Sequence, residues 1–223
     1  MTLNEYAYEI WEEIRPNIVD DDSIDIRLIK RLIDNQRTLW VENDINKGED
    51  PTRYAQSLGT IDLILKPSSY DETTLTGKIM MVTTGQAIPV PIYRNGKPLF
   101  TLINPLDMRT VQYKYVEPQS AWSRGNGTFN SLQTFVTYAN GKIELFGNNL
   151  DFLSGLKSIH VEGVFERPTD VASFNDETSE YPMSEKLWAY LKSQVVKILR
   201  EKIFGPEDKI NDSTNENIET RSK

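Results

Sequence analysis

The sequence predicts an α+β protein, with an N-terminal two-helix segment and a C-terminal long helix packed together, an inserted antiparallel β-sandwich or partly open barrel, and a flexible C-terminal tail. Apolar residues recur every three to four positions near both ends of the chain, alternate with polar residues in the middle, and are separated there by Gly, Pro and Asn. We therefore expect an N-terminal helical segment over 1–58, a β domain over 59–167, a C-terminal helix over 168–205 and an extended or disordered interaction tail over 206–223.

The first helix is predicted to begin after Thr2, because Thr2 and Glu5 have the spacing of a capping box. One apolar stripe follows at three- and four-residue steps, and Pro16 ends the pattern. The members of this stripe are Leu3, Tyr6, Ala7, Ile10, Trp11 and Ile14.

The second helix is predicted over 24–46, with several aspartates before it as candidate N-caps and Gly48 as its terminator. Its apolar residues fall on two lines, so much of its circumference is apolar and should be covered from more than one side, in part by another chain. We predict Leu39 and Trp40 as interface residues. The two lines are Ile26, Ile29, Ile33 and Trp40, and Leu28, Leu32 and Leu39.

Eight short strands are predicted between Gly59 and Arg167. Asn95-Gly96 and Asn140-Gly141 predict type I′ hairpin turns, and the prolines at 89, 91 and 98 predict edge or irregular strands because they lack the amide hydrogen. The expected strands are 60–66, 78–83, 88–94, 99–103, 110–115, 132–138, 142–146 and 158–166.

The loop 116–131 is long for a compact domain and contains Trp122 and Phe129, which we predict to be partner-binding residues. The third helix is expected to begin with Pro182 in its first turn and to end at Gly205-Pro206. The tail after it has only two large aliphatic residues, Ile210 and Ile218, so alone it should be disordered and bind a partner through them.

Composition excludes several kinds of site. The 223 residues include no Cys and one His, His160, which excludes disulfides, thiol nucleophiles and any metal site that needs Cys or two His ligands. A net charge of -8 argues against general nucleic-acid binding. No apolar run reaches the roughly 18 residues of a membrane span, so we expect no membrane partner and cytosol-like surroundings.

No catalytic motif is present, and we predict no enzyme activity, no cofactor and no metal. Gly125-Asn126-Gly127 lacks the third glycine of a dinucleotide fingerprint, and Asp20 to Asp25 lacks the glycine and the glutamate of a calcium loop, so helix capping is favoured there. Three carboxylates that could suggest a glycosidase pair are instead predicted on the solvent face with His160, opposite Ile159, Val161 and Phe165. They are Glu144, Glu162 and Glu166.

Acidic residues gather at one end. Residues 1–25 hold eight of them against Arg15, or -7 of the total -8. Such a segment either meets a basic partner, keeps polyanions from sticking, or is simply a set of solvated helix faces and caps. We take Asp20, Asp21, Asp22 and Asp25 as candidates to face a channel.

The same residues, in their order along the chain, resemble a ring or adaptor protein from the neck of crAss-like tailed bacteriophages. The similarity lies in Thr2-Leu3-Asn4-Glu5, in IRLIKRLIDNQRTLWVENDINKG, in YAQSLGTIDLIL, in HVEGVFERPTDV, in YPMSEKLWAYLKSQVVKIL and in the later Asn211-Asp212-Ser213. It is weaker over 83–156.

The resemblance implies a structural virion protein, assembled in the cytoplasm of the host bacterium. It implies a homo-oligomeric ring of twelve copies beneath a portal protein, contacts with other neck or tail proteins, and passage of genomic DNA through the ring without sequence-specific binding. The alternative that the residues leave open is a carbohydrate- or receptor-binding β module at the virion periphery, with Trp122 and Phe129 as its site.

Overall fold

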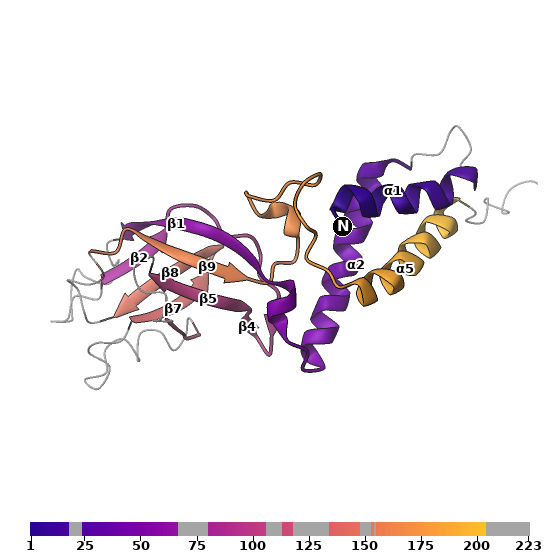
Figure 1. Cartoon of the computed structure of the whole chain (residues 1–223). Coiled ribbons are helices and arrows are strands. Elements are labelled where there is room, and N and C mark those ends of the chain that lie inside the picture. Colours follow the sequence, from indigo (N-terminus) through magenta and orange to yellow (C-terminus); the bar gives the residue numbers. More distant parts are fainter. Residues whose placement is uncertain are drawn as a thin grey trace, which may run out of the picture.

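The computed structural model describes residues 1–17, 24–66, 80–105, 113–117, 134–147, 153 and 155–203. Three long helices, α1 (Leu3–Ile14), α2 (Ile26–Asn46) and α5 (Glu185–Ile203), lie at one end of an elongated molecule, and the strands lie at the other (Figure 1). The predicted α+β class, with helices from both ends of the chain around an inserted sheet, is confirmed. The tail 206–223 lies outside the described residues.

The first two helices begin where their caps place them. In α1 the Thr2 hydroxyl accepts the Glu5 amide at 3.2 Å and the Glu5 carboxylate accepts the Thr2 amide at 2.8 Å, which completes the predicted capping box. Helix α2 begins at Ile26 rather than residue 24, because Asp25 is its N-cap and accepts the Leu28 amide at 2.7 Å.

Helix α5 begins three residues later than predicted. Pro182 is not in its first turn, since the Met183 amide donates to the Tyr181 carbonyl at 2.7 Å in a tight turn before the helix. The Ser184 hydroxyl then accepts the Leu187 amide at 3.3 Å, as a cap does. The predicted stop at Gly205-Pro206 lies outside the described residues.

Seven strands form one sheet in the order β5-β9-β1-β2-β8-β7-β6, and a separate pair, β3 with β4, forms a small hairpin (Figure 1). Neighbouring strands run antiparallel except β6 and β7, which are parallel. The strands are β1 (Gln56–Lys66), β2 (Met80–Thr84), β3 (Tyr93–Arg94), β4 (Lys97–Pro98), β5 (Phe100–Pro105), β6 (Lys114–Tyr115), β7 (Thr134–Ala139), β8 (Lys142–Gly147) and β9 (Ser158–Gly163).

The sheet curls until its two edges meet. The Tyr113 amide, just before edge strand β6, donates to the Ile103 carbonyl of edge strand β5 at 3.0 Å, and the rings of Phe100 and Tyr138 pack edge to face with centroids 5.6 Å apart. Of the two predicted β architectures, the structure is therefore the partly open barrel rather than the sandwich.

The predicted strand 158–166 ends at Gly163, β4 was not predicted, and two other strands differ more. The strand expected over 88–94 is reduced to Tyr93–Arg94 and a single bridge between Pro91 and Phe165, because proline cannot donate to a ladder. Strand β1 begins at Gln56 instead of residue 60, through an irregularity at Gly59, whose φ is +70°. Both predicted Asn-Gly turns are confirmed, with φ between 51° and 76° at all four positions.

The described residues form four buried clusters, of which a small one consists of Val116, Phe135 and Phe146 of the sheet domain and the other three follow one another along the molecule. The first lies among α1, α2 and α5, and another fills the curled sheet. Between them lies a junction core that α2 and the start of α5 share with the sheet domain. Its members are Val41, Ile45, Tyr54, Ile92, Val164 and Leu187. Helix α2 thus contributes to the helical core with its first half and to the junction core with its second half.

Candidate assembly surfaces

The two interface residues predicted on α2 lie at its surface. Leu39 is 60% exposed, and Trp40 is half-buried with its ring against Tyr190 of α5, at 4.3 Å between centroids. Tyr190 is itself 51% exposed. We call Leu39, Trp40 and Tyr190 the aromatic face. Large apolar side chains that are exposed next to one another are candidates for a contact with another chain.

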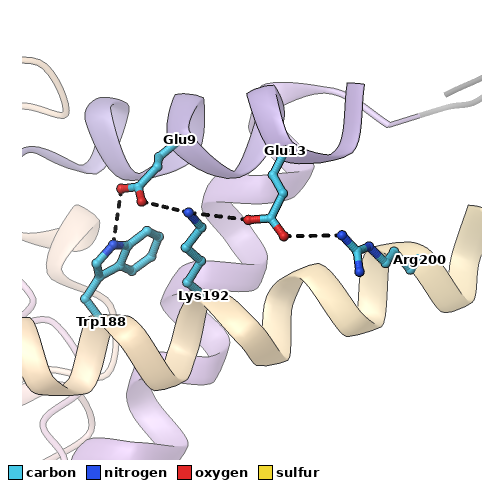
Figure 2. Close-up of polar contacts among 5 residues, drawn as sticks. All are labelled: Glu9, Glu13, Trp188, Lys192 and Arg200. Carbon is cyan, nitrogen blue, oxygen red and sulfur yellow. Dashed lines mark hydrogen bonds and ion pairs between the residues drawn. The ribbon is translucent and has the colours of Figure 1, made fainter. Parts of the chain in front are cut away.

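The acidic side chains of α1 are partly neutralised by α5. Figure 2 shows the Lys192 ammonium between Glu9 and Glu13, at 2.7 Å and 3.3 Å from their carboxylate oxygens. Arg200 also pairs with Glu13 at 3.3 Å, and the indole of Trp188 donates to Glu9 at 3.2 Å. The hydrogen bond that the Lys192 ammonium donates to the Glu9 carboxylate raises the pKa of Lys192. We call these five residues the ion-pair ladder; it fastens α1 to α5.

The predicted channel-facing aspartates divide into two groups. Asp25 caps α2, which is the role that the capping interpretation gives it. Asp20, Asp21 and Asp22 lie outside the described residues.

Four predicted partner-binding residues also lie outside the described part of the chain. They are Trp122 and Phe129 of the long loop, and Ile210 and Ile218 of the tail. Their roles remain predictions, and so does the glycan-binding alternative that depends on the two loop aromatics.

Glu162 and His160 lie as alternation predicts, whereas Glu166 lies beyond the end of β9 at Gly163 and not on the predicted strand. Along β9, Ile159 and Val161 are buried while His160 and Glu162 are partly exposed on the other side. The His160 ring nitrogen lies 3.0 Å from the Glu162 carboxylate, so these two side chains pair along one strand. Within the described residues, no three His, Asp or Glu side chains gather as metal ligands would, and no helix has the length and apolarity to cross a membrane.

The structure reveals a buried polar cluster that the sequence analysis did not identify. Arg37 of α2 is fully buried; its Nε donates to the Pro182 carbonyl at 2.9 Å and its Nη1 to the Phe165 carbonyl at 3.1 Å. Asp34, one turn earlier, accepts the Tyr181 hydroxyl at 2.6 Å and the Thr169 hydroxyl at 3.1 Å. This cluster ties α2 to the segment that joins β9 to α5.

Burial dominates the electrostatics of this cluster. It raises the pKa of the Asp34 carboxyl, although the Tyr181 and Thr169 hydroxyls donate to the carboxylate. It lowers the pKa of the Arg37 guanidinium, and it raises the pKa of the Tyr181 hydroxyl well above the usual range. A signal was present in the sequence, because Asp34 and Arg37 interrupt the apolar positions Ile29, Ile33 and Val41 on the buried side of α2.

Comparison with known families gives one match. The model of a crAss-like phage ring family described as phage tail ring protein 2 matches residues 5–217. The match includes α2, α5, α1 except its first two residues, the whole sheet, the aromatic face, the ion-pair ladder and the buried polar cluster. No curated protein matches the chain.

Proposed function

The chain belongs to the phage tail ring protein 2 family, and we propose that it forms an adaptor ring in the neck of the virion, between the portal and the tail. As a member of this family it is a structural component of a phage tail ring. The family match over 5–217 is the observation that supports the proposal, because it covers nearly the whole chain and the family is described as a phage tail ring protein. The finer position, next to the portal, is our inference.

A ring imposes a requirement on the subunit surface. Each subunit in a closed ring meets the next through two different faces, so it must carry apolar or charged surface that its own chain leaves uncovered. The aromatic face supplies such a surface. Leu39 and Tyr190 each leave more than half of their side chain exposed although they lie on helices that pack against each other. We propose that this face is buried against a neighbouring protein in the virion.

We also propose that twelve copies surround a channel through which the genome passes. A net charge of -8 suits such a channel, since an acidic wall repels phosphates and lets DNA slide. The ion-pair ladder uses Glu9 and Glu13 for packing α1 on α5, so Asp20 to Asp22 and Asp25 remain the acidic candidates for the channel wall.

Mass photometry and electron microscopy of the purified protein, alone and mixed with its portal protein, test this function. We expect particles at one fixed multiple of 25.6 kDa, ring-shaped class averages, and a complex with the portal. A protein that stays monomeric at all concentrations and with the portal present would overturn the proposal.

A matched pair of substitutions tests the aromatic face. Leu39→Glu should weaken the assembly with itself or with the portal, because it places a charge in an interface that must lose water. Ile64→Glu, on the sheet at a similar exposure of 54%, is the control and should assemble as the wild type does. Equal behaviour of the two variants would show that the aromatic face is not an assembly surface.

A further inference from the structure

A cleft lined by four basic and three acidic side chains lies between α2 and the segment that follows β9. It has a volume of about 370 Å³ and is lined by Arg27, Lys30 and Arg31 of α2 and by Arg167. Lys30 is bound to Asp176 at 2.9 Å, whereas the three arginines are exposed and form no ion pair with any described residue. We call these three residues the arginine cleft. In a protein of net charge -8, three such guanidiniums at one place call for an anionic ligand.

A complementary surface lies on another helix of the same chain. Glu5, Tyr8 and Glu12 are spaced three and four residues apart on α1, so they share one face, opposite the buried residues of that helix. Tyr8 is 54% exposed. Glu12 makes no ion pair within the described part of the chain, in contrast to Glu9 and Glu13 of the ladder. We call Glu5, Tyr8 and Glu12 the outer face of α1.

We propose that, in the ring, the outer face of α1 of one subunit docks on the arginine cleft of the next subunit. The inference rests on the proposed ring function and names the contact that closes it. The contact joins two different faces, as a head-to-tail ring requires. Each guanidinium presents a planar pair of donors that matches a carboxylate, so Glu12 supplies a ligand that the cleft lacks, and Glu5, whose Oε2 accepts the Thr2 amide, supplies its other oxygen.

The composition of the cleft favours a protein carboxylate over a nucleic-acid phosphate. Asp34, Asp170 and Asp176 line the same cleft as the arginines. A duplex lays a continuous row of phosphates over a surface, so it would meet these carboxylates as well as the guanidiniums. A helix face with two separated carboxylates can be placed so that each meets an arginine while avoiding the acids.

Charge reversal on the full-length protein tests the contact. Arg31→Glu and Glu12→Arg should each raise the concentration at half-assembly, measured by mass photometry, roughly tenfold or more, because a like charge then stands in every interface. The protein that carries both changes should assemble close to the wild-type concentration, since each interface again pairs opposite charges. Arg167 lies on the opposite side of the cleft from Arg31, so Arg167→Glu should raise the concentration at half-assembly as Arg31→Glu does.

Lys97→Glu, an exposed residue of β4, is the matched control and should leave assembly unchanged. Thermal melts of each variant verify that the monomer is folded.

If the wild type assembles and Arg31→Glu assembles equally well, the docking contact is wrong while the ring function stands. If the wild type never assembles, both are wrong. If Arg31→Glu instead abolishes binding of a labelled 30-base-pair duplex and leaves assembly intact, the cleft binds DNA and the proposed contact is overturned.

Discussion

Arg37 is the side chain that fixes the two ends of the molecule relative to each other. It lies on α2 and donates to the carbonyls of Phe165 and Pro182, which stand at the two ends of the segment between the sheet and α5. Its guanidinium also lies 5.7 Å from the centre of the Tyr181 ring. The segment between the sheet and α5 has no regular secondary structure at these two carbonyls. The Arg37 guanidinium therefore supplies the hydrogen-bond donors that a helix or a sheet would otherwise supply.

Replacing this guanidinium should be costly. Arg37→Met keeps much of the volume but leaves two buried carbonyls without donors and removes the cation beside Asp34, so we expect a loss of about 3–5 kcal/mol in the free energy of unfolding. Urea titration followed by circular dichroism measures it. Arg53→Met is the control, because Arg53 is exposed and its pair with Glu49 should contribute less than about 1 kcal/mol. Similar losses in both variants would contradict the role given to Arg37.

Asp34 should make the stability depend on pH. Its pKa is raised by burial above the ordinary value of 3.8, so the folded state favours the protonated carboxyl. Its contribution to the free energy of unfolding is therefore complete below pH 3.8 and is lost as pH rises through the folded-state pKa. The Tm of Asp34→Asn relative to wild type should increase between about pH 4 and pH 7. A difference that is constant over this range would show that Asp34 does not titrate in this way.

At this scale the sequence is a good guide only where the partners are neighbours in the chain. The capping box of Thr2 and Glu5 was predictable from spacing alone, whereas the sequence offered several aspartates as N-cap of α2 and the structure selects Asp25. Arg37 finds its acceptors about 130 and 145 residues away, and no local pattern encodes such a distance. The sequence reveals only that a charge occupies an apolar position.

The packing of α1 on α5 is stabilised by the ion-pair ladder as well as by contacts between their apolar side chains. Lys192→Met removes the ammonium that joins Glu9 to Glu13 while keeping the aliphatic stem. We expect a loss of about 1 kcal/mol at low salt and less at 1 M salt, because the pair is partly exposed and screened. Lys197→Met, whose side chain is 70% exposed and 3.9 Å from Glu201, should change stability by less than about 0.5 kcal/mol. A loss for Lys192→Met that is the same at both salt concentrations would argue against an electrostatic role for the ladder.

A helix or hairpin could be predicted where a single local signal, either the spacing of apolar residues or the residues of one turn, determines it. Both Asn-Gly hairpins form because Asn and Gly accept positive φ angles, and the stripe of α1 is buried as its period requires. The strand expected over 88–94 is irregular, as its prolines indicated, but it is shorter than predicted because Pro89 and Pro91 remove two donors and only Tyr93–Arg94 forms a strand. The start of α5 shifts because the carbonyl of Pro182 is used by Arg37, a contact from a distant helix.

The whole molecule is a rod with unlike ends, and α2 runs from the helical core into the junction core (Figure 1). This arrangement leaves the outer face of α1 and the arginine cleft on the helical part and the aromatic face beside the junction core. Of the candidate site, Leu39 and Trp40 could be predicted because the second helix has more apolar residues than one core can cover. The arginine cleft could not, since Arg167 joins Arg27 and Arg31 only through the fold.

The last prediction concerns the tail, which we propose as an arm for a partner rather than a part of the fold. The three helices already bury one another through Leu191, Val195 and Leu199 of α5, all of which precede the tail. Deleting 206–223 should therefore leave the Tm of the monomer unchanged within about 1 °C and weaken assembly with the ring or the portal, because Ile210 and Ile218 are lost. A full-length variant with both Ile210→Asp and Ile218→Asp distinguishes the effect of these two side chains on assembly from the effect of shortening the tail. A drop in monomer Tm of several degrees on truncation would mean that the tail packs on its own subunit instead.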